Sequence, residues 1–377
     1  MSSVVAPIDT ARLVARLRQL VEVESPSQNK AAVDRAADLV STWAEAMGAA
    51  VKRHQQKEYG DILELKFGPR TNRNRTLLLG HLDTVWPLGT LAQMPWREES
   101  GKGGKPGKIG GPGVLDMKSG VMMALEAIAV TQHLNLPVTL LLVSEEEIGS
   151  PVSRAVTERV AAQCARVFVL EPAQGLAYKT SRKGIGHYTF HVQGVAAHAG
   201  VDFDRGHSAV LEMSRIIQEV SAFTGTKPGL TVNVGTVQGG TQSNVVAASC
   251  SAEVDVRIAK ATDAKHIARL FARLKTTDKA CKLTVTGGIN RPPMERKPGT
   301  VSLFRTAQSI AKEMGFHLDE ASTGGGSDGN FTAAIGVPTL DGMGSVGTGA
   351  HAVHENIEVA HIEERTMLLA RMLAAVK

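Results

Sequence analysis

The sequence predicts an α/β protein in which a smaller α+β domain is inserted into a larger sheet domain. In the first half of the chain, short apolar runs of strand length alternate with segments whose apolar residues recur at helical spacing. This alternation is typical of a largely parallel sheet with helices on both faces. After about residue 180 the order becomes β-α-β-β-α-β, which is that of a ferredoxin-like domain. We therefore expect a sheet domain over 1–180 and 288–377, with the inserted domain over 181–287.

Helical periodicity predicts helices over 9–23 and 30–47, the second capped by Ser27 and ended by Gly48. The remaining elements expected in the first segment are strand 61–67, strand 76–80, helix 119–133, strand 138–143, a helix from about 150 and strand 167–170. Residues 98–113 are dense in Gly, Lys and Pro, and predict a loop.

The inserted domain has its own sequence of elements. They are strand 186–192, helix 207–222, strand 231–237, strand 251–258, helix 263–275 and strand 282–286. Helices over 300–314 and 361–375 then resume the pattern of the sheet domain.

The bulk composition is that of an ordinary globular protein, with 377 residues, 43% of them hydrophobic and 21% charged. The net charge of +5 comes from dispersed basic residues, with the clearest cluster between Arg97 and Lys108. Because no Lys/Arg run or recognition module occurs, we expect no nucleic-acid partner. A start without basic residues, and no run of about 18 apolar residues, predict a cytoplasmic protein without a membrane span.

The three cysteines, Cys164, Cys250 and Cys281, are odd in number and far apart. This pattern excludes both a disulfide framework and a CxxC zinc site. We expect buried thiols in a reducing compartment.

Histidines and carboxylates recur where strands or glycine-rich loops end. They are His81, Asp83, Asp116, the run Glu145–Glu147, Glu171 and His351. Taken alone, the pair His81 and Asp83 would be interpreted as an ordinary surface pair, and a cap between loop and helix is the alternative interpretation of Asp116. Recurrence of imidazole and carboxylate without cysteine favours a catalytic zinc-type site over a structural one.

Five of these ligands are too many for one tetrahedral ion. If Asp116 bridges two ions, each receives one imidazole, one terminal carboxylate and the shared Asp116. Paired metals about 4 Å apart suit hydrolysis because they acidify a water and polarise a carbonyl. Asp83 is expected to accept the other ring N–H of His81.

Three adjacent carboxylates at Glu145–Glu147 repel one another. One metal ligand beside one general base resolves this repulsion, although the spacing does not say which glutamate has which role. The glycine-rich segment Thr323–Asp328 lacks the Lys and the spacing of a phosphate-binding P-loop. Glycines that let the backbone approach a bound substrate fit this segment better.

Together these segments resemble the dizinc metallopeptidases that include glutamate carboxypeptidase (carboxypeptidase G), acetylornithine deacetylase and succinyl-diaminopimelate desuccinylase. The resemblance runs from about residue 10 to the C-terminus. The motifs that carry it are GHLDTV at 80–85, GPGVLDMKSG at 111–120, SEEEIGS at 144–150, LEP at 170–172, AHAG at 197–200, TGGGSD at 323–328 and the segment around His351.

The resemblance implies two zinc ions per chain, with cobalt or manganese as substitutes. The implied metal ligands are His81, Asp116 as the bridge, Glu147, Glu171 on the ion of His81, and His351. Glu146 matches the general base. His354 follows His351 closely and makes the last ligand ambiguous, but Glu355, four residues after His351, favours His351.

The inserted domain resembles the lid and dimerisation domain of this family, which implies a homodimer. His198 matches a histidine that reaches the partner's active site and stabilises the oxyanion. Asn244 and Arg257 resemble groups that bind the free carboxylate of the substrate, and Arg's planar fork suits that geometry. Arg291 is a further candidate, and the backbone around Gly325 resembles the floor of the same pocket.

The implied activity is hydrolysis of an amide or peptide bond next to a free carboxylate, in a small peptide or an N-acyl amino acid. Glu171, where aminopeptidases carry aspartate, favours the carboxypeptidase and deacylase members. Pro112, where deacylases often carry arginine, favours the glutamate carboxypeptidase branch, and Ser119 replaces a common glycine. An N-acyl amino acid deacylase is the alternative, because only pocket shape distinguishes it. A non-catalytic metal- or peptide-binding homologue is a further alternative, but it would not need Glu146.

Overall fold

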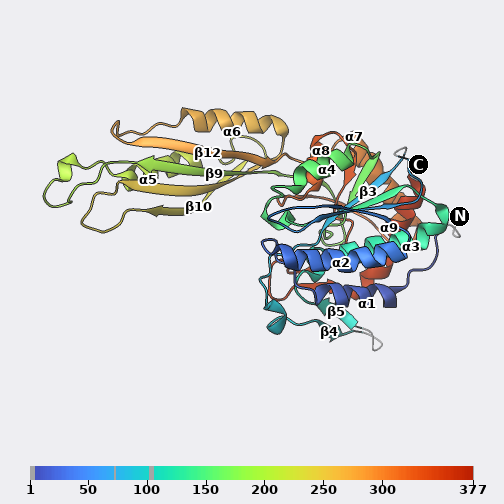
Figure 1. Cartoon of the computed structure of the whole chain (residues 1–377). Helices are drawn as coiled ribbons and strands as arrows, with labels where there is room; N and C mark the ends of the chain where they lie inside the picture. Colours follow the sequence, from blue (N-terminus) through green and yellow to red (C-terminus); the bar gives the residue numbers. More distant parts are fainter. Residues whose placement is uncertain (1–4, 72–73, 102–105, 377) are drawn as a thin grey trace. The chain divides into compact units, whose positions relative to one another are not determined.

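The computed structural model describes residues 5–71, 74–101 and 106–376. Its contacts divide the chain into two compact units (Figure 1). The first comprises Met1–Ser181, Arg296–Thr323 and Ser327–Lys377, and the second comprises Arg182–Glu295 with Gly324–Gly326. Each unit is described by itself below.

A six-stranded sheet lies at the centre of the first unit, in the order β1-β2-β6-β3-β7-β14. Its strands are β1 Ala50–His54, β2 Ile62–Phe67, β3 Thr76–His81, β6 Val138–Val143, β7 Arg166–Val169 and β14 Thr339–Leu340. Strand β3 runs parallel to β6 and β7, and β7 runs parallel to β14. The pairs β1–β2 and β2–β6 are antiparallel. The prediction of a largely parallel sheet is therefore correct only for the half that contains β3 and β7.

Successive residues of a strand point to opposite faces of the sheet, so apolar strands place an apolar core on each face. Helices cover both of these faces. Leu78 and Leu140 belong to the larger core, whereas Leu77 and Leu141 belong to the smaller one. The larger core includes residues of α1 Thr10–Val21, α2 Lys30–Ala46, α3 Ser119–Thr131, α7 Pro298–Glu313 and α9 Ile362–Ala375. The smaller core includes α4 Ser153–Ala161, which contacts α8 Gly329–Ala334.

The predicted loop over 98–113 is wrong where it covers a hairpin. Strand β4 Arg97–Ser100 pairs with β5 Pro106–Gly110, and β5 pairs with β16 Asn356–Glu358, which pairs with β15 Gly347–Thr348. The polar, exposed strand β4 has no apolar alternation that could reveal it. The central part of the predicted loop and of the basic cluster, residues 102–105, lies outside the described residues.

The cap predicted for α2 is also wrong. Asn29, not Ser27, is the N-cap, and its side chain accepts a hydrogen bond from the backbone N–H of Ala32. The hydroxyl of Ser27 instead donates to Asp83 at 2.6 Å. Gly48, in the left-handed conformation, follows the helix as predicted.

The second unit has the predicted β-α-β-β-α-β order. Its elements are β9 Gly184–Gln193, α5 Ala209–Ser221, β10 Thr231–Gly239, β11 Ser249–Ile258, α6 Ala261–Arg273 and β12 Lys282–Arg291. The sheet order is β10-β11-β9-β12, and every pair is antiparallel. Strand β12 extends to Arg291, so the domain boundary predicted at 287 falls within a strand that pairs with β9.

One further small sheet joins β8 Tyr178–Arg182 to β13 Glu320–Thr323. Among the described residues, no helix is both long enough and apolar enough to cross a bilayer.

Helix α3 begins against the end of β7, and Gly120 permits this close approach. A Cβ atom at Gly120 would lie 2.1 Å from the carbonyl oxygen of Leu170. We predict that Gly120→Ala lowers the free energy of unfolding by at least about 1 kcal/mol. The reason is that the cost of overpacking the core exceeds the stability gained from the higher helix propensity of alanine. Chemical denaturation measures the change.

The matched control is Gly288→Ala on β12, where no atom lies within 4 Å of the added Cβ. Its stability should stay within about 0.5 kcal/mol of the wild type. A Gly120→Ala variant as stable as the wild type would show that α3 does not need the glycine.

Candidate metal centre

His81 is the last residue of β3 and its side chain is buried. Its Nδ1 lies 2.9 Å from the backbone carbonyl oxygen of Asp83, and 3.4 Å from Oδ1 of the Asp83 side chain. Because a carbonyl oxygen only accepts, the neutral ring carries its proton on Nδ1. The lone pair of Nε2 then faces Asp116. The expected orienting role of Asp83 thus falls mainly to its backbone.

The side chain of Asp83 connects His81 to the glutamate segment. It is buried, and its Oδ1 accepts the backbone N–H of Glu146 at 3.1 Å. Its Oδ2 accepts the N–H of Glu147 at 3.2 Å and the hydroxyl of Ser27 at 2.6 Å. These bonds hold the glutamates beside β3.

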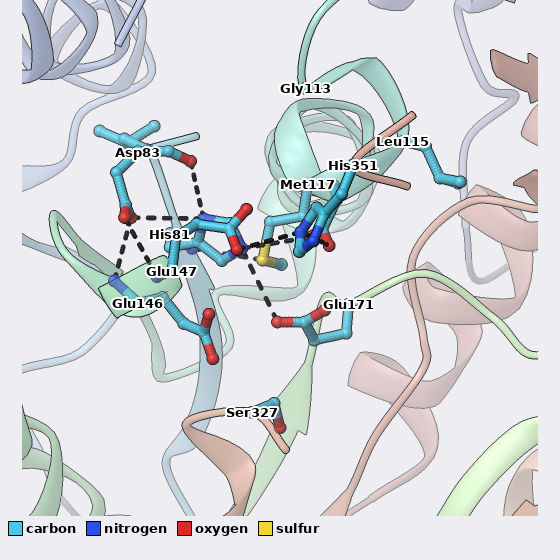
Figure 2. Close-up of polar contacts among 12 residues, drawn as sticks. His81, Asp83, Gly113, Leu115, Met117, Glu146, Glu147, Glu171, Ser327 and His351 are labelled. Atoms are coloured by element: carbon cyan, nitrogen blue, oxygen red, sulfur yellow. Dashed lines mark hydrogen bonds and ion pairs between the residues drawn. The ribbon is translucent and has the colours of Figure 1, made fainter. Parts of the chain in front are cut away.

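The five predicted ligands lie together in the first unit. Figure 2 labels His81, Glu147, Glu171 and His351. Oδ1 of Asp116 lies 3.1 Å from Nε2 of His81, and Oδ2 lies 3.4 Å from Nε2 of His351. Nε2 of His351 also lies 3.1 Å from Oε2 of Glu147. Nε2 of His81 lies 3.8 Å from Oε1 of Glu171. Asp116 therefore presents one oxygen to each histidine.

Two overlapping groups of side chains in this cluster have ligand atoms close enough to hold a metal ion. The groups are His81 with Asp116 and Glu147, and His81 with Glu146 and Glu171. Within each group the ligand atoms lie within 4.8 Å of one another.

The structure gives the three adjacent glutamates different surroundings. Glu145 is buried, and its Oε1 accepts the N–H groups of Val152 and Ser153 at 3.1 and 2.5 Å. Its Oε2 accepts the hydroxyl of Ser144 at 2.7 Å. Glu145 thus caps α4, which begins at Ser153 and not at the predicted 150. Only Glu146 and Glu147 face the cluster, a division that spacing alone does not predict.

Electrostatics in the cluster reflect an excess of carboxylates. The carboxylates of Asp116 and Glu147, which accept hydrogen bonds from the protonated ring, raise the pKa of His351 to about 10. Burial lowers the pKa of His81, but Asp116 and Asp83 outweigh burial and raise the pKa well above its usual value. Burial raises the pKa of Glu147 to about 7. In the metal-free protein, protons on the imidazoles therefore balance the carboxylates, and cations that bind here displace those protons.

The donor set fits metal ions. It consists of imidazole nitrogens and carboxylate oxygens, which zinc accepts, and contains none of the three cysteines. Among the described residues, the buried Oε1 of Glu147 has no hydrogen-bond partner. A buried carboxylate oxygen without a donor is costly, and a cation supplies the missing partner.

The predicted substrate-binding residues lie in the second unit. His198 is exposed and forms an antiparallel bridge with Val245, next to Asn244. Nδ1 of His198 accepts the N–H of Gly200 at 3.1 Å. Arg257 donates from Nε and Nη2 to the carboxylate of Asp255, both at 2.8 Å. This ion pair, which the sequence analysis missed, holds the Arg257 side chain along β11.

The segment Gly324–Gly326 approaches arginine side chains closely. Nη1 of Arg257 donates to the Gly324 carbonyl at 3.2 Å, and Nη1 of Arg182 donates to the Gly325 and Gly326 carbonyls at 3.3 and 2.9 Å. A Cβ at Gly326 would lie 2.9 Å from Cδ of the buried Arg291. Sequence reasoning missed Arg182, because no motif distinguishes it.

Fold and site together define an α/β protein with a cluster of metal ligands at a sheet edge, in which His81 is buried and His351 is half-exposed. The chain belongs to peptidase family M20/M25/M40, whose family model matches residues 77–375. It is therefore a hydrolytic enzyme, which removes the alternative of a non-catalytic homologue.

Two curated relatives span most of the chain. Carboxypeptidase G2 of Pseudomonas sp. (strain RS-16) is 28% identical over 375 residues, covering 96% of this chain and 88% of that protein. Succinyl-diaminopimelate desuccinylase of Cereibacter sphaeroides is 29% identical over 326 residues, covering 81% of this chain and 84% of that protein. Both belong to the groups that the sequence motifs indicate.

Solved structures share the fold across the whole chain. Aminopeptidase PepT of Bacillus cereus aligns with a TM-score of 0.82 at 21% identity, covering 98% of this chain and 99% of that one. The YXEP protein of Bacillus subtilis, described as a dinuclear metal binding peptidase from the M20 family, aligns with a TM-score of 0.69 at 14% identity. It covers 97% of this chain and 98% of its own.

The cap formed by Glu145 gives a testable stability difference. We predict that Glu145→Ala lowers the free energy of unfolding of the metal-free protein by about 2–4 kcal/mol, because buried donors lose their acceptor. The control is Glu158→Ala on the helix that Glu145 caps, in a partly exposed ion pair with Arg154, which should cost under about 1 kcal/mol. Equal losses in the two variants would contradict the capping role.

Proposed function

We propose that the chain is a zinc-dependent hydrolase that cleaves an amide or peptide bond next to a free carboxylate, as a glutamate-type carboxypeptidase. The observation that carries the proposal is the position of Asp116, with one oxygen 3.1 Å from His81 and the other 3.4 Å from His351. A carboxylate shared in this way suits two metal ions. Similarity to carboxypeptidase G2 over 96% of the chain supports the substrate class.

Two zinc ions per chain are part of this proposal, with cobalt or manganese as substitutes. His81, Asp116 and Glu171 would hold one ion, and His351, Asp116 and Glu147 the other. When bound, the pair supplies Lewis acidity that acidifies water and polarises the scissile carbonyl. The description of the YXEP protein as a dinuclear metal binding peptidase supports this arrangement.

Glu146 is the proposed general base. It takes a proton from the attacking water and returns it to the leaving nitrogen. The carboxylate of Glu145 is occupied by backbone and hydroxyl donors. A carboxylate oxygen of Glu146 lies within 4.8 Å of the ligand atoms of His81 and Glu171, a position that suits proton exchange with a water in the cluster. Asp83 supports this role, because it holds the backbone of Glu146.

The proposed substrate carboxylate binds Arg257, with Arg291 and the backbone of Gly325 at the same end of the second unit's sheet. Asn244 lies beside His198, beyond the opposite ends of β9 and β11, so it would reach the carboxylate from the partner chain of the proposed dimer. Asp255 fixes two of the five N–H groups of Arg257, and the Gly324 carbonyl takes a third. The N–H groups left on Arg257 are then oriented in advance for a substrate oxygen. Glutamate is the favoured leaving group.

We infer a homodimer in which His198 of one chain stabilises the oxyanion in the site of the other. The support is an exposed apolar surface around His198. Val195, Val201 and Phe203 are 43%, 76% and 64% exposed. An apolar surface of this kind is typical of a contact between proteins. A cytoplasmic location also stays a prediction, supported by the three free cysteines.

An N-acyl amino acid deacylase is the second candidate function. The similarity to succinyl-diaminopimelate desuccinylase over 81% of the chain favours it. It uses the same chemistry and differs in the acyl group that the pocket accepts.

A substrate panel with metal analysis tests the proposal. Zinc-reloaded protein should hold about two equivalents of metal and hydrolyse N-acyl-glutamates and peptides ending in glutamate. Chelation should abolish turnover, and added zinc should restore it. Preference for N-acetylornithine or N-succinyl-diaminopimelate would favour the deacylase. Turnover that survives complete metal removal, or a metal content near zero after reloading, would refute the metal-dependent hydrolase.

The role of Glu146 makes a separate prediction. Glu146→Gln should keep the fold and the metal content but reduce kcat by about a hundredfold to ten-thousandfold, because the amide cannot accept the proton. Steady-state kinetics with metal analysis measures this loss. Turnover near that of the wild type would move the base to another group.

The trans position of His198 is tested by mixing two inactive variants. Homodimers of His198→Ala and of Glu146→Gln should each be nearly inactive, and a mixture with verified subunit exchange should regain part of the activity. Each heterodimer then contains one site with an intact Glu146 and an intact His198 from the partner. A mixture that stays inactive after exchange, or a fully active monomer, would rule out the trans arrangement.

A further inference from the structure

Glu355 has a buried side chain that accepts four hydrogen bonds. Its Oε1 accepts the backbone N–H groups of Leu115 and Asp116 at 2.9 and 3.1 Å. Its Oε2 accepts the N–H of Gly113 at 3.1 Å and the indole N–H of Trp86 at 3.0 Å. All four donors are distant from Glu355 in the sequence: three belong to the turn that carries Asp116, and the fourth is Trp86.

These bonds join the three segments that supply the centre of the cluster. Trp86 follows His81 by five residues, Asp116 lies in the bonded turn, and Glu355 follows His351 by four residues. Asp116 has φ −113° and ψ 96° within this turn, so the helical pattern of backbone bonds is interrupted there. In this turn the carboxylate of Glu355, rather than a helical carbonyl group, accepts the backbone N–H groups of Gly113, Leu115 and Asp116.

We propose that Glu355 is a positioning residue, which fixes Asp116 between His81 and His351 and thereby sets the metal affinity of the centre. The inference rests on the proposed metal-dependent function. Residues that orient metal ligands typically change metal affinity about tenfold to a hundredfold when they are replaced.

The chemistry of the four bonds requires a carboxylate. Every partner of Glu355 is an N–H donor, and an ionised carboxylate has only acceptor positions on both oxygens. A glutamine side chain has the same size but would direct its NH₂ group at two of the donors. Glu355→Gln therefore keeps the packing and removes about half of the contacts that hold the turn.

A second buried carboxylate in the chain provides a matched control. Glu126 on α3 is 2% exposed and accepts the N–H of Asp9 at 2.9 Å and the guanidinium of Arg12 at 2.8–3.0 Å. Its partners include no residue of the metal cluster. Glu126→Gln should reduce stability without changing how metal is bound, which separates a structural effect from a positioning effect.

The experiment compares wild type, Glu355→Gln and Glu126→Gln, each reloaded with Co²⁺. Competition with a chelator measures affinity, visible absorption reports ligand geometry, and hydrogen exchange on the metal-free protein reports the amides of Leu115 and Asp116. We expect Glu355→Gln to bind Co²⁺ about tenfold to a hundredfold more weakly, with an altered spectrum and faster exchange. Glu126→Gln should match the wild type in Co²⁺ affinity and in visible spectrum.

Unchanged Co²⁺ affinity and spectrum in folded Glu355→Gln would overturn the inference and leave the proposed function standing. Failure of the wild type to bind Co²⁺ would instead refute the proposed function itself. Should Glu355→Gln not fold, Trp86→Phe removes one donor to Oε2 and keeps an aromatic ring. A several-fold weaker affinity in that variant supports the inference, and wild-type affinity with a wild-type spectrum overturns it.

Discussion

The structure depends on holding several carboxylates together at one edge of a sheet. Each carboxylate of the cluster lies 3.1–3.8 Å from an imidazole nitrogen of His81 or His351; the carboxylates are those of Asp116, Glu147 and Glu171. Repulsion between such charges opposes folding unless cations balance them. The neighbouring carboxylates raise the pKa of each histidine, which favours protonated imidazoles as counter-charges when no cation is bound. The parallel order of β6, β3 and β7 concentrates these groups, because their carboxyl ends meet at the same edge.

A second set of buried carboxylates makes this arrangement rigid. Asp83, Glu145 and Glu355 each accept backbone N–H groups from the loops that carry the cluster, so their charges are used to hold loops in place. Hydrogen bonds between a carboxylate and N–H donors are stronger than bonds between neutral groups. The side chains that face the centre and those that fix the loops thus have the same chemistry but different partners.

The sequence predicted most of the fold and the members of the cluster, because both leave local signals. The apolar strand β3 ends at His81, and the apolar strand β6 ends just before the run Glu145–Glu147. The order β-α-β-β-α-β is visible from the periodicity of apolar residues. The sequence did not predict β4, whose polar residues carry no alternation, or the N-cap Asn29, which stands two residues from an equally suitable serine. The bonds of Glu145 and Glu355 to backbone N–H groups depend on tertiary geometry, so neither role has a signature in the sequence.

The central claim is that Asp116 is shared between two metal ions. Anomalous diffraction from crystals of the zinc-reloaded protein tests it most directly. We expect two peaks per chain, each about 2.0–2.2 Å from a different oxygen of Asp116, one beside His81 and Glu171 and the other beside His351 and Glu147. A single peak, or two peaks that do not share Asp116, would contradict it.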